Sequence, residues 1–365
     1  MITYNDRKLL GKQYNLENIT IGTIGSHSAL EIMDGAKDEN FRTLCICQKG
    51  RERTYQRFKR LVDEIILVDN FSDIMNSENQ EKLRQVNTIM IANRALTAYL
   101  GYENIENKLV VPIFGNRYLL RAEERTVERN QYYLMEKSNV RHPRIYKKPD
   151  DIGGLAIIKV PDARRKLERA FFIVSSYDDY LKKSKSKIEQ GIINEEDLES
   201  ATIEEYIVGT YFNFNFFYSP LTKETEFLGI DRRLQTNIHD FVSLPAKEQM
   251  GLDIDIRNIE IGHTPASIRE SMLEKVFEIG DRFVEHVRSE FPPGIIGPVC
   301  LQSIVTSDLE IVVYDISLRV PGNPILALTS PYAKYYHGHP MGVGRRIAIE
   351  VKKAMEDNKL SEIIT

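Results

Sequence analysis

The chain has 365 residues, more than a single compact core usually holds, so two or three closely associated domains are expected. Hydrophobic residues make up 42% of the chain and charged residues 28%, a balance that excludes intrinsic disorder and a coiled coil. The net charge of −4 gives no basic field that would attract nucleic acid or membrane, and no apolar run is long enough to span a bilayer. Three cysteines are too few for a disulfide framework. We therefore expect a cytoplasmic protein that binds small molecules.

Short apolar runs alternate with helix-like spacing in the first third of the chain. The expected strands are residues 19–24, 43–47, 64–68, 88–92 and 110–113, and the expected helices are 29–38, 51–62 and one from residue 78. Such alternation predicts βαβ units and a parallel sheet. A long charged helix is then expected over residues 121–138.

The pattern changes near residue 145 to one typical of antiparallel α+β structure. Strands at 155–160 and 171–175, backed by an amphipathic helix at 177–190, predict a small separate lobe. A third region is expected to hold one long helix, 267–289, and strands at 202–206, 211–218, 225–229, 299–305 and 310–317. We therefore expect a mixed α/β and α+β chain with domains at residues 1–120, 121–200 and 201–365.

Polar side chains recur along the closing hairpin. Gln302 lies on one strand and Asp315 and Ser317 on the other, and period-two alternation can place all three on one sheet face. Magnesium prefers hard oxygen ligands, commonly one or two carboxylates together with substrate phosphates, and this hairpin offers such a set. An ordinary half-buried hairpin with polar outer residues would have the same spacing, so both interpretations stay open.

Two other segments could hold a nucleotide. Lys159 ends an apolar strand, where a cation could reach phosphates, although strand-end lysines are more commonly surface residues. The strand around Glu204 could offer backbone hydrogen bonds to a nucleobase. An edge strand with exposed carboxylates would have the same sequence pattern.

The turn Gly25-Ser26-His27 lies between an expected strand and an expected helix, where free amide groups and the helix dipole favour an anion. His27 could add a hydrogen bond or a positive charge there. The alternative is a Ser-capped helix with a structural histidine, since caps need no ligand. Cys45 and Cys47 have no nearby histidine pattern and are expected to be packed strand residues rather than zinc ligands.

A set of segments spread over nearly the whole chain carries a resemblance to a known family. These segments are Ile24-Gly25-Ser26-His27-Ser28, Val68-Asp69-Asn70-Phe71-Ser72-Asp73-Ile74, Phe114-Gly115-Asn116-Arg117, Ile203-Glu204-Glu205-Tyr206-Ile207-Val208-Gly209-Thr210, Phe217-Tyr218-Ser219-Pro220-Leu221, Ile268-Arg269-Glu270-Ser271, Pro292-Pro293-Gly294-Ile295-Ile296-Gly297-Pro298 and Cys300-Leu301-Gln302-Ser303. Together they resemble the archaeal formate-dependent 5-formaminoimidazole-4-carboxamide ribonucleotide (FAICAR) synthetases, which are ATP-grasp ligases of purine biosynthesis.

The resemblance implies an ATP-grasp fold with an N-terminal βαβ domain. It implies a reaction in which ATP phosphorylates formate and the 5-amino group of the carboxamide nucleotide (AICAR) attacks the resulting formyl phosphate. The implied cofactors are ATP and Mg²⁺, with Mn²⁺ as a possible substitute. The implied partners are formate and an AICAR-like nucleotide, together with further copies of the chain in a homo-oligomer, and neither nucleic acid nor membrane.

The resemblance also implies roles for individual residues. Substrate would contact His27, Arg94 and His263, and the metal would be held by Gln302 and Asp315. ATP would be held by Lys159, Glu204, Glu205, Tyr206, Val208, Glu226 and Arg319. No covalent nucleophile is implied, because such catalysis depends on positioning and on electrostatic stabilisation of phosphoryl charge.

Several positions depart from the family pattern. Residues 162–170 contain no glycine where the family has a glycine-rich phosphate loop, so Arg and Lys side chains would have to replace backbone amides there. A Gly-Ser pair is replaced by Asn93-Arg94, a substrate Asn by His263, and a metal-binding Glu by Asp315. Two alternatives to the ligase therefore stay open: a divergent paralogue that joins another carboxylate to another amine, and a nonenzymatic nucleotide-binding protein.

Overall fold

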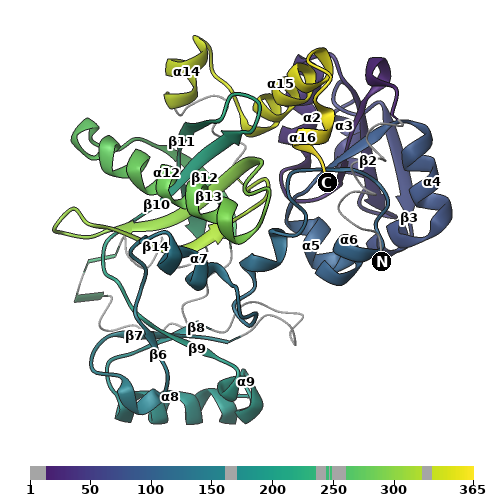
Figure 1. Ribbon diagram of the computed structural model, residues 1–365. Coiled ribbons are helices and arrows are strands. Elements are labelled where there is room, and N and C mark those ends of the chain that lie inside the picture. The colour runs from purple at the N-terminus through teal and green to yellow at the C-terminus, as the bar shows by residue number, and fades with distance from the viewer. Residues whose placement is uncertain (1–13, 161–170, 236–243, 246, 249–259, 323–330) are drawn as a thin grey trace.

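The computed structural model describes residues 14–160, 171–235, 244–245, 247–248, 260–322 and 331–365. Its strands form three sheets, which belong to an N-terminal domain, a small lobe and a large lobe (Figure 1). Within the described ranges, none of the helices has the length and apolar character needed to cross a bilayer.

The N-terminal sheet is parallel, as the alternating pattern predicts. Its order is β3-β2-β1-β4-β5, and its strands are β1 (Thr20–Ile24), β2 (Arg42–Gln48), β3 (Glu64–Val68), β4 (Thr88–Ile91) and β5 (Ile113–Phe114). The helical segments around it are η1 (Leu16–Asn18), α2 (Ala29–Asp38), α3 (Arg53–Arg57), η2 (Phe71–Met75), α4 (Ser77–Gln85), α5 (Arg94–Leu100) and α6 (Tyr102–Asn107). The strand order reverses between β1 and β4, which is the place where open α/β sheets bind ligands.

The small lobe contains an antiparallel sheet of order β6-β9-β7-β8. Its elements are β6 (Ile145–Tyr146), η4 (Pro149–Asp151), β7 (Ala156–Lys159), β8 (Phe171–Val174), α8 (Tyr177–Glu189), α9 (Glu195–Glu199) and β9 (Thr202–Glu205). Ile158 and Val174 are fully buried beneath α8, whose Tyr180 faces the same core. This separate α+β lobe confirms the change of pattern near residue 145.

The large lobe is built on an antiparallel sheet of order β12-β11-β10-β13-β14. The strands are β10 (Thr210–Ser219), β11 (Glu224–Gln235), β12 (Glu260–Ala266), β13 (Gly297–Val305) and β14 (Ile311–Ser317). One face is apolar and packs against α7 (Gln131–Lys137) and α12 (Leu273–Glu290). The opposite face carries polar side chains, which form the site described below.

Three helix predictions are wrong in extent. The helix expected over 51–62 is present only as α3 (Arg53–Arg57). The region expected to be one helix over 121–138 contains η3 (Leu120–Glu123), an irregular stretch and then α7, because the Asn130 side chain accepts from the amides of Tyr132 and Tyr133 and starts a new helix. The helix expected from residue 267 begins with η6 (Glu270–Met272) and only then continues as α12. Strand β12 was not expected at all, and β11 is longer than predicted.

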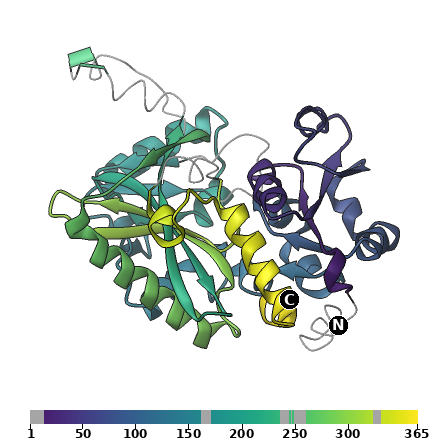
Figure 2. The same ribbon diagram turned by 90° about the horizontal axis from the view of Figure 1, so that it is seen from above.

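The C-terminal helices are α14 (Tyr332–His337), α15 (Val343–Glu356) and α16 (Leu360–Ile363). Helix α15 packs on α2 so closely that a Cβ atom at Gly35 would lie 1.9 Å from the Arg345 amide nitrogen. Figure 2 shows α15 between the large sheet and the N-terminal domain. Thr365 also exchanges backbone hydrogen bonds with Ile113 of β5, so the packing of α7 and of these C-terminal residues cuts across the expected domain boundaries.

Candidate active site

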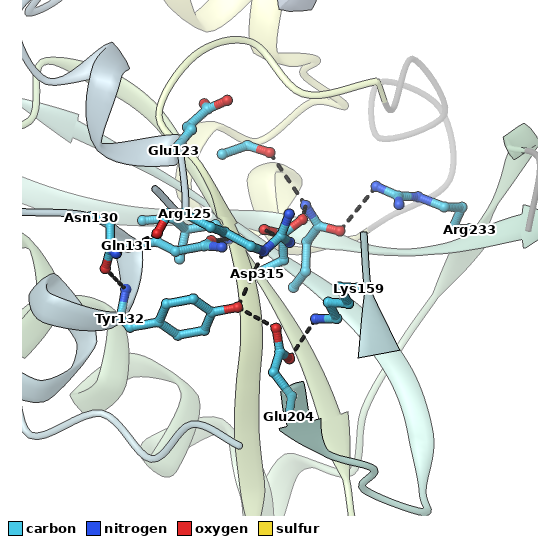
Figure 3. Close-up of polar contacts among 12 residues, drawn as sticks. Glu123, Arg125, Asn130, Gln131, Tyr132, Lys159, Glu204, Arg233 and Asp315 are labelled. Carbon is cyan, nitrogen blue, oxygen red and sulfur yellow. Dashed lines mark hydrogen bonds and ion pairs between the residues drawn. The ribbon is translucent and has the colours of Figure 1, made fainter. Parts of the chain in front are cut away.

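The ammonium group of Lys159 and the carboxylate of Glu204 form a buried pair at the junction of the small lobe with the large sheet. Their Nζ and Oε2 atoms lie 2.5 Å apart, and the side chains are 8% and 1% exposed. Burial lowers the pKa of Lys159, against the opposing effect of the Glu204 charge. The Tyr132 hydroxyl of α7 donates to the same carboxylate (Figure 3).

The closing hairpin supplies a group of oxygen atoms beside this pair. Gln302 of β13 is paired with Asp315 of β14, and its side-chain amide lies 3.3 Å from Asp315 Oδ2 and 3.4 Å from Ser317 Oγ. The prediction that these three side chains share one face is therefore confirmed. A register shift after Gln302, with Tyr314 as the extra residue, marks a β-bulge of the kind often found beside active sites.

Two arginines bind the oxygens of this hairpin. Arg125 lies 3.0 Å from Asp315 Oδ1 and 3.2 Å from the Tyr132 hydroxyl, while Arg233 of β11 donates to Gln302 Oε1 at 2.9 Å (Figure 3). These contacts join the Lys159–Glu204 pair to the large sheet through Tyr132 and Arg125. The polar face thus has cations and hard oxygen acceptors side by side.

Arg233 continues the contacts toward the edge strand β12. Its Nε lies 2.9 Å from Glu260 Oε2. The His263 ring lies between two carboxylates, with Nε2 2.9 Å from Glu260 Oε1 and Nδ1 2.5 Å from Asp231 Oδ2. Burial acts to lower the pKa of His263, but the hydrogen bonds that its ring donates to the two carboxylates raise it to about 9. His263 is therefore an imidazolium at neutral pH.

The carboxyl edge of the N-terminal sheet meets the segment that follows β14. Ser28 Oγ donates to the Pro321 carbonyl at 2.5 Å, and the Val320 amide donates to the Ala92 carbonyl at 3.0 Å. The His27 ring lies against Gly322, where an added Cβ atom would be 2.2 Å from the ring. Burial and the nearby charge of Arg319 lower the pKa of His27.

Two family models cover most of the chain: "Domain of unknown function (DUF1297)" matches residues 179–365, and "Protein of unknown function (DUF1246)" matches residues 21–146. The chain is 44% identical, over 100% of both lengths, to the "5-formaminoimidazole-4-carboxamide-1-(beta)-D-ribofuranosyl 5'-monophosphate synthetase" of Methanocaldococcus jannaschii. The chain belongs to this synthetase family.

Solved structures agree with this assignment. The IMP biosynthesis protein PurP from Thermococcus kodakaraensis has 26% identity and a TM-score of 0.71, over 94% of this chain and 100% of that one. A biotin carboxylase–β-γ-ATP complex from Campylobacter jejuni has 11% identity and a TM-score of 0.58, over 91% of this chain and 70% of that one, which is a likeness of fold alone. The synthetase fold is therefore ATP-grasp, as expected.

The structure brings several of the expected site residues of this synthetase together. Lys159, Glu204, Gln302 and Asp315 are joined through Tyr132 and Arg125, and His263 reaches Gln302 through Glu260 and Arg233. The resemblance had not supplied these four connecting residues. Arg233 could have been found from the sequence, because it follows Asp231 by two residues and so shares its strand face. Arg125 and Tyr132 belong to a stretch that was expected to be one continuous helix, so nothing in the sequence pattern indicated that they belong to the site.

Other expected residues lie at the margins of this group. Arg94 begins α5 directly after Asn93, whose side chain donates to the Ile24 carbonyl at 3.0 Å and so ties the end of β4 to the end of β1. Arg319 follows β14, with its Nη2 atom 3.4 Å from Glu123 Oε2. These residues line the junction of the N-terminal domain with the large lobe.

The chain leaves the small sheet after Glu205. Glu205 ends β9 and accepts from the Arg144 amide at 3.2 Å, while the Tyr206 amide donates to the Leu155 carbonyl at 2.9 Å. Val208 is 68% exposed. The loop that lacks glycine falls at residues 161–170, outside the described residues.

Glu226 is not brought to the site. It lies five residues before Asp231 on β11, roughly 17 Å away at strand rise. Its carboxylate is held by Arg346 at 2.7 Å and by His337 Nε2 at 3.0 Å. Burial alone would raise the pKa of Glu226, but hydrogen bonds from Arg346 hold it below its ordinary value.

The hairpin oxygens suit a magnesium ion that completes its ligand shell with phosphate oxygens. Asp315 provides a carboxylate, Gln302 an amide oxygen and Ser317 a hydroxyl, which are hard donors. Among the described residues, no three or more His, Cys, Asp and Glu side chains are arranged so that together they could hold a metal ion. Asp315 Oδ1 and Gln302 Oε1 accept hydrogen bonds from the guanidinium groups of Arg125 and Arg233, so both oxygens interact with cations in the structure.

Proposed function

We propose that this chain is an ATP-dependent carbon–nitrogen ligase that joins formate to the 5-amino group of AICAR and so forms FAICAR. The observation that carries the proposal is the 44% identity over the whole length to a protein named for that product. The polar face supports it, because cationic side chains and hard oxygen ligands lie together there.

The reaction would proceed in two transfers. A formate oxygen attacks the γ-phosphorus of ATP, the bond to the bridging oxygen breaks, and ADP leaves. The amine of AICAR then attacks the carbonyl carbon of formyl phosphate, the carbon–oxygen bond to phosphate breaks, and the amine loses a proton. The products are FAICAR, ADP and phosphate.

The residues of the polar face would bind and orient these groups. Lys159, Arg125 and Arg233 would carry positive charge toward the triphosphate, and the low dielectric of their surroundings would strengthen their attraction to its phosphate groups. Gln302 and Asp315 would hold Mg²⁺, which when bound neutralises phosphate charge. The chain segment from Glu204 to Val208 would bind the nucleotide base, with Arg319 nearby.

The acceptor nucleotide would enter at the end of β1 and β4. His27 and Arg94 lie at this edge, and His263 faces it from the large sheet. The three cysteines are free and buried, which suits a cytoplasmic enzyme. By family analogy the enzyme would be a homo-oligomer and would accept Mn²⁺ in place of Mg²⁺.

The test is ADP release from purified protein with ATP, Mg²⁺, formate and AICAR, leaving out each component in turn, with ¹³C-formate to follow the new formamide carbon by NMR. ADP release that needs both substrates, together with ¹³C in FAICAR, is expected. Asp315→Asn serves as the matched negative control, since it keeps size and removes charge. Release only with another amine would favour a divergent paralogue, and tight ATP binding without release would favour a nonenzymatic nucleotide-binding protein.

A further inference from the structure

A β-bulge in the edge strand β12 re-aims two charged side chains. His263 is paired with Arg233 and Gly262 with Leu234, but Gln235 is paired with Glu260, so Ile261 is an extra residue. Ile261 is 66% exposed. Residues three apart on a regular strand face opposite sides, and the bulge lets Glu260 and His263 face the same side.

The bulge places His263 between two carboxylates. Its Nδ1 lies 2.5 Å from Asp231 Oδ2 and its Nε2 lies 2.9 Å from Glu260 Oε1, and the side chain is 7% exposed. Only the protonated ring can donate from both nitrogens at once. Asp231 is fully buried and accepts from the side-chain amides of Asn213 at 2.7 Å and Asn215 at 2.8 Å, so this end of the group is fixed.

The other end of the group reaches the proposed metal and phosphate site. Glu260 accepts from His263 with one oxygen and pairs with Arg233 through the other, at 2.9 Å from Nε. Arg233 in turn donates to Gln302 at 2.9 Å. The orientation of the Arg233 guanidinium therefore depends on Glu260, and that of Glu260 on His263.

We propose that His263 is a positioning residue for the ligase reaction: held between Asp231 and Glu260, it directs Arg233 at Gln302 and at the phosphoryl group transferred there. The proposal rests on the proposed function for its effect on catalysis. Its geometric part, that His263 sets the orientation of Arg233, is independent of the reaction.

The protonation of His263 gives the proposal a pH signature. The charged groups facing it are Asp231 and Arg233 on β11, Glu260 on its own strand and His27 on the β1–α2 turn. The two carboxylates raise the pKa of the His263 ring to about 9, so the ring stays protonated up to about that pH. Below that pH the ring can donate to both carboxylates, and above it the neutral ring can donate to only one of them, so the link from Asp231 through His263 to Glu260 is broken.

The test combines NMR on the resting enzyme with steady-state kinetics. In the wild-type protein the His263 ring should titrate near pH 9, and in His263→Gln the Arg233 Nε–H resonance should shift. His263→Gln should lower kcat about tenfold, the scale seen when outer-shell partners of a site are lost, with a smaller change in the KM for ATP. The kcat of the wild-type enzyme should fall as the pH rises through about 9, where His263 loses its proton, and this fall should be absent in His263→Gln.

Two further variants separate positioning from simple loss of structure. Glu260→Gln keeps an acceptor for His263 but removes the pairing charge, so it should lower the NMR pKa of His263 and reduce kcat in the same way. His286→Gln makes the same histidine change on α12, where the ring contacts the Arg282 carbonyl, and should leave kcat and its pH profile unchanged.

A His263 ring that titrates near its ordinary pKa, or an Arg233 resonance unchanged in His263→Gln, would overturn the proposal whether or not the enzyme is active. Persistence of the high-pH fall in His263→Gln would also overturn it. Absence of FAICAR formation by wild-type enzyme would instead refute the proposed function, and the NMR measurements would still decide whether His263 positions Arg233.

Discussion

Replacement of Glu226 by Gln separates an ATP-binding role, which the resemblance implies, from a structural one. In the structure the Glu226 carboxylate accepts three hydrogen bonds from Arg346, at 2.8 and 3.1 Å from Nε and 2.7 Å from Nη2, and both side chains are at least 90% buried. Removing one partner of such a pair leaves an uncompensated buried charge and costs about 3–5 kcal/mol. In the variant Arg346 keeps its ion pair with Glu350, at 2.9 Å, so we expect the free energy of unfolding to fall by about 3 kcal/mol, the lower end of that range.

The assay is urea unfolding at pH 7, in which the midpoint should fall with little change in slope. The stabilisation by Glu226 also depends on pH, because its folded-state pKa is depressed below the ordinary 4.5. It is fully present above the unfolded-state pKa and is lost as the pH falls through the folded-state value. The difference between wild type and Glu226→Gln should therefore shrink in acid.

Glu224→Gln is the matched control, since Glu224 lies two residues away on the same strand and is exposed, so the change should stay within about 0.5 kcal/mol. Glu226→Gln with Arg346→Met should recover part of the lost stability. The reasoning is refuted if Glu226→Gln unfolds like wild type while its KM for ATP rises tenfold or more.

Three further outcomes are expected. Asp315→Asn should abolish the Mg²⁺-dependent part of ATP binding measured by calorimetry, and unchanged affinity would place the metal elsewhere. Gly35→Ala should lower the melting temperature sharply, because its Cβ would overlap the Arg345 backbone, whereas Gly50→Ala meets no atom within 4 Å and, with its φ of +88°, should cost only about 1 kcal/mol. Burial raises the pKa of Glu31 to about 7, so between about pH 4.5 and 7 the folded state binds a proton that the unfolded state has lost, and the free energy of unfolding falls as the pH rises. Glu31→Gln should remove this dependence of stability on pH, measured by urea unfolding at a series of pH values. An unchanged dependence would contradict the prediction.

Much of the fold could be predicted because local sequence periodicity reflects local burial. The parallel strands β1 to β4, the helix α2 and the hairpin β13–β14 follow from such patterns. The alternation also placed Gln302, Asp315 and Ser317 on one face, which the strand register confirms. Strand β12 escaped prediction because its polar residues and bulge break the period of two.

The connecting residues of the site could not be predicted from pattern. Arg125 follows η3 and Tyr132 lies in α7, and they meet Asp315 and Glu204 only because α7 packs beside the large sheet. Glu226 shows the reverse case: the resemblance implied a contact with ATP, but α15 packs against the large sheet and supplies Arg346 as its partner.

The sequence by itself determined the family, the division into parallel and antiparallel sheets and the chemical character of the hairpin, because these depend on residues close together in the chain. Tertiary structure alone decided which charged side chains meet which polar or charged partners. Lys159 with Glu204, Arg233 with Gln302 and Glu226 with Arg346 are joined across 45, 69 and 120 positions. Such pairs form when folding removes side chains from water and each buried charge must be compensated by whichever partner packing brings near.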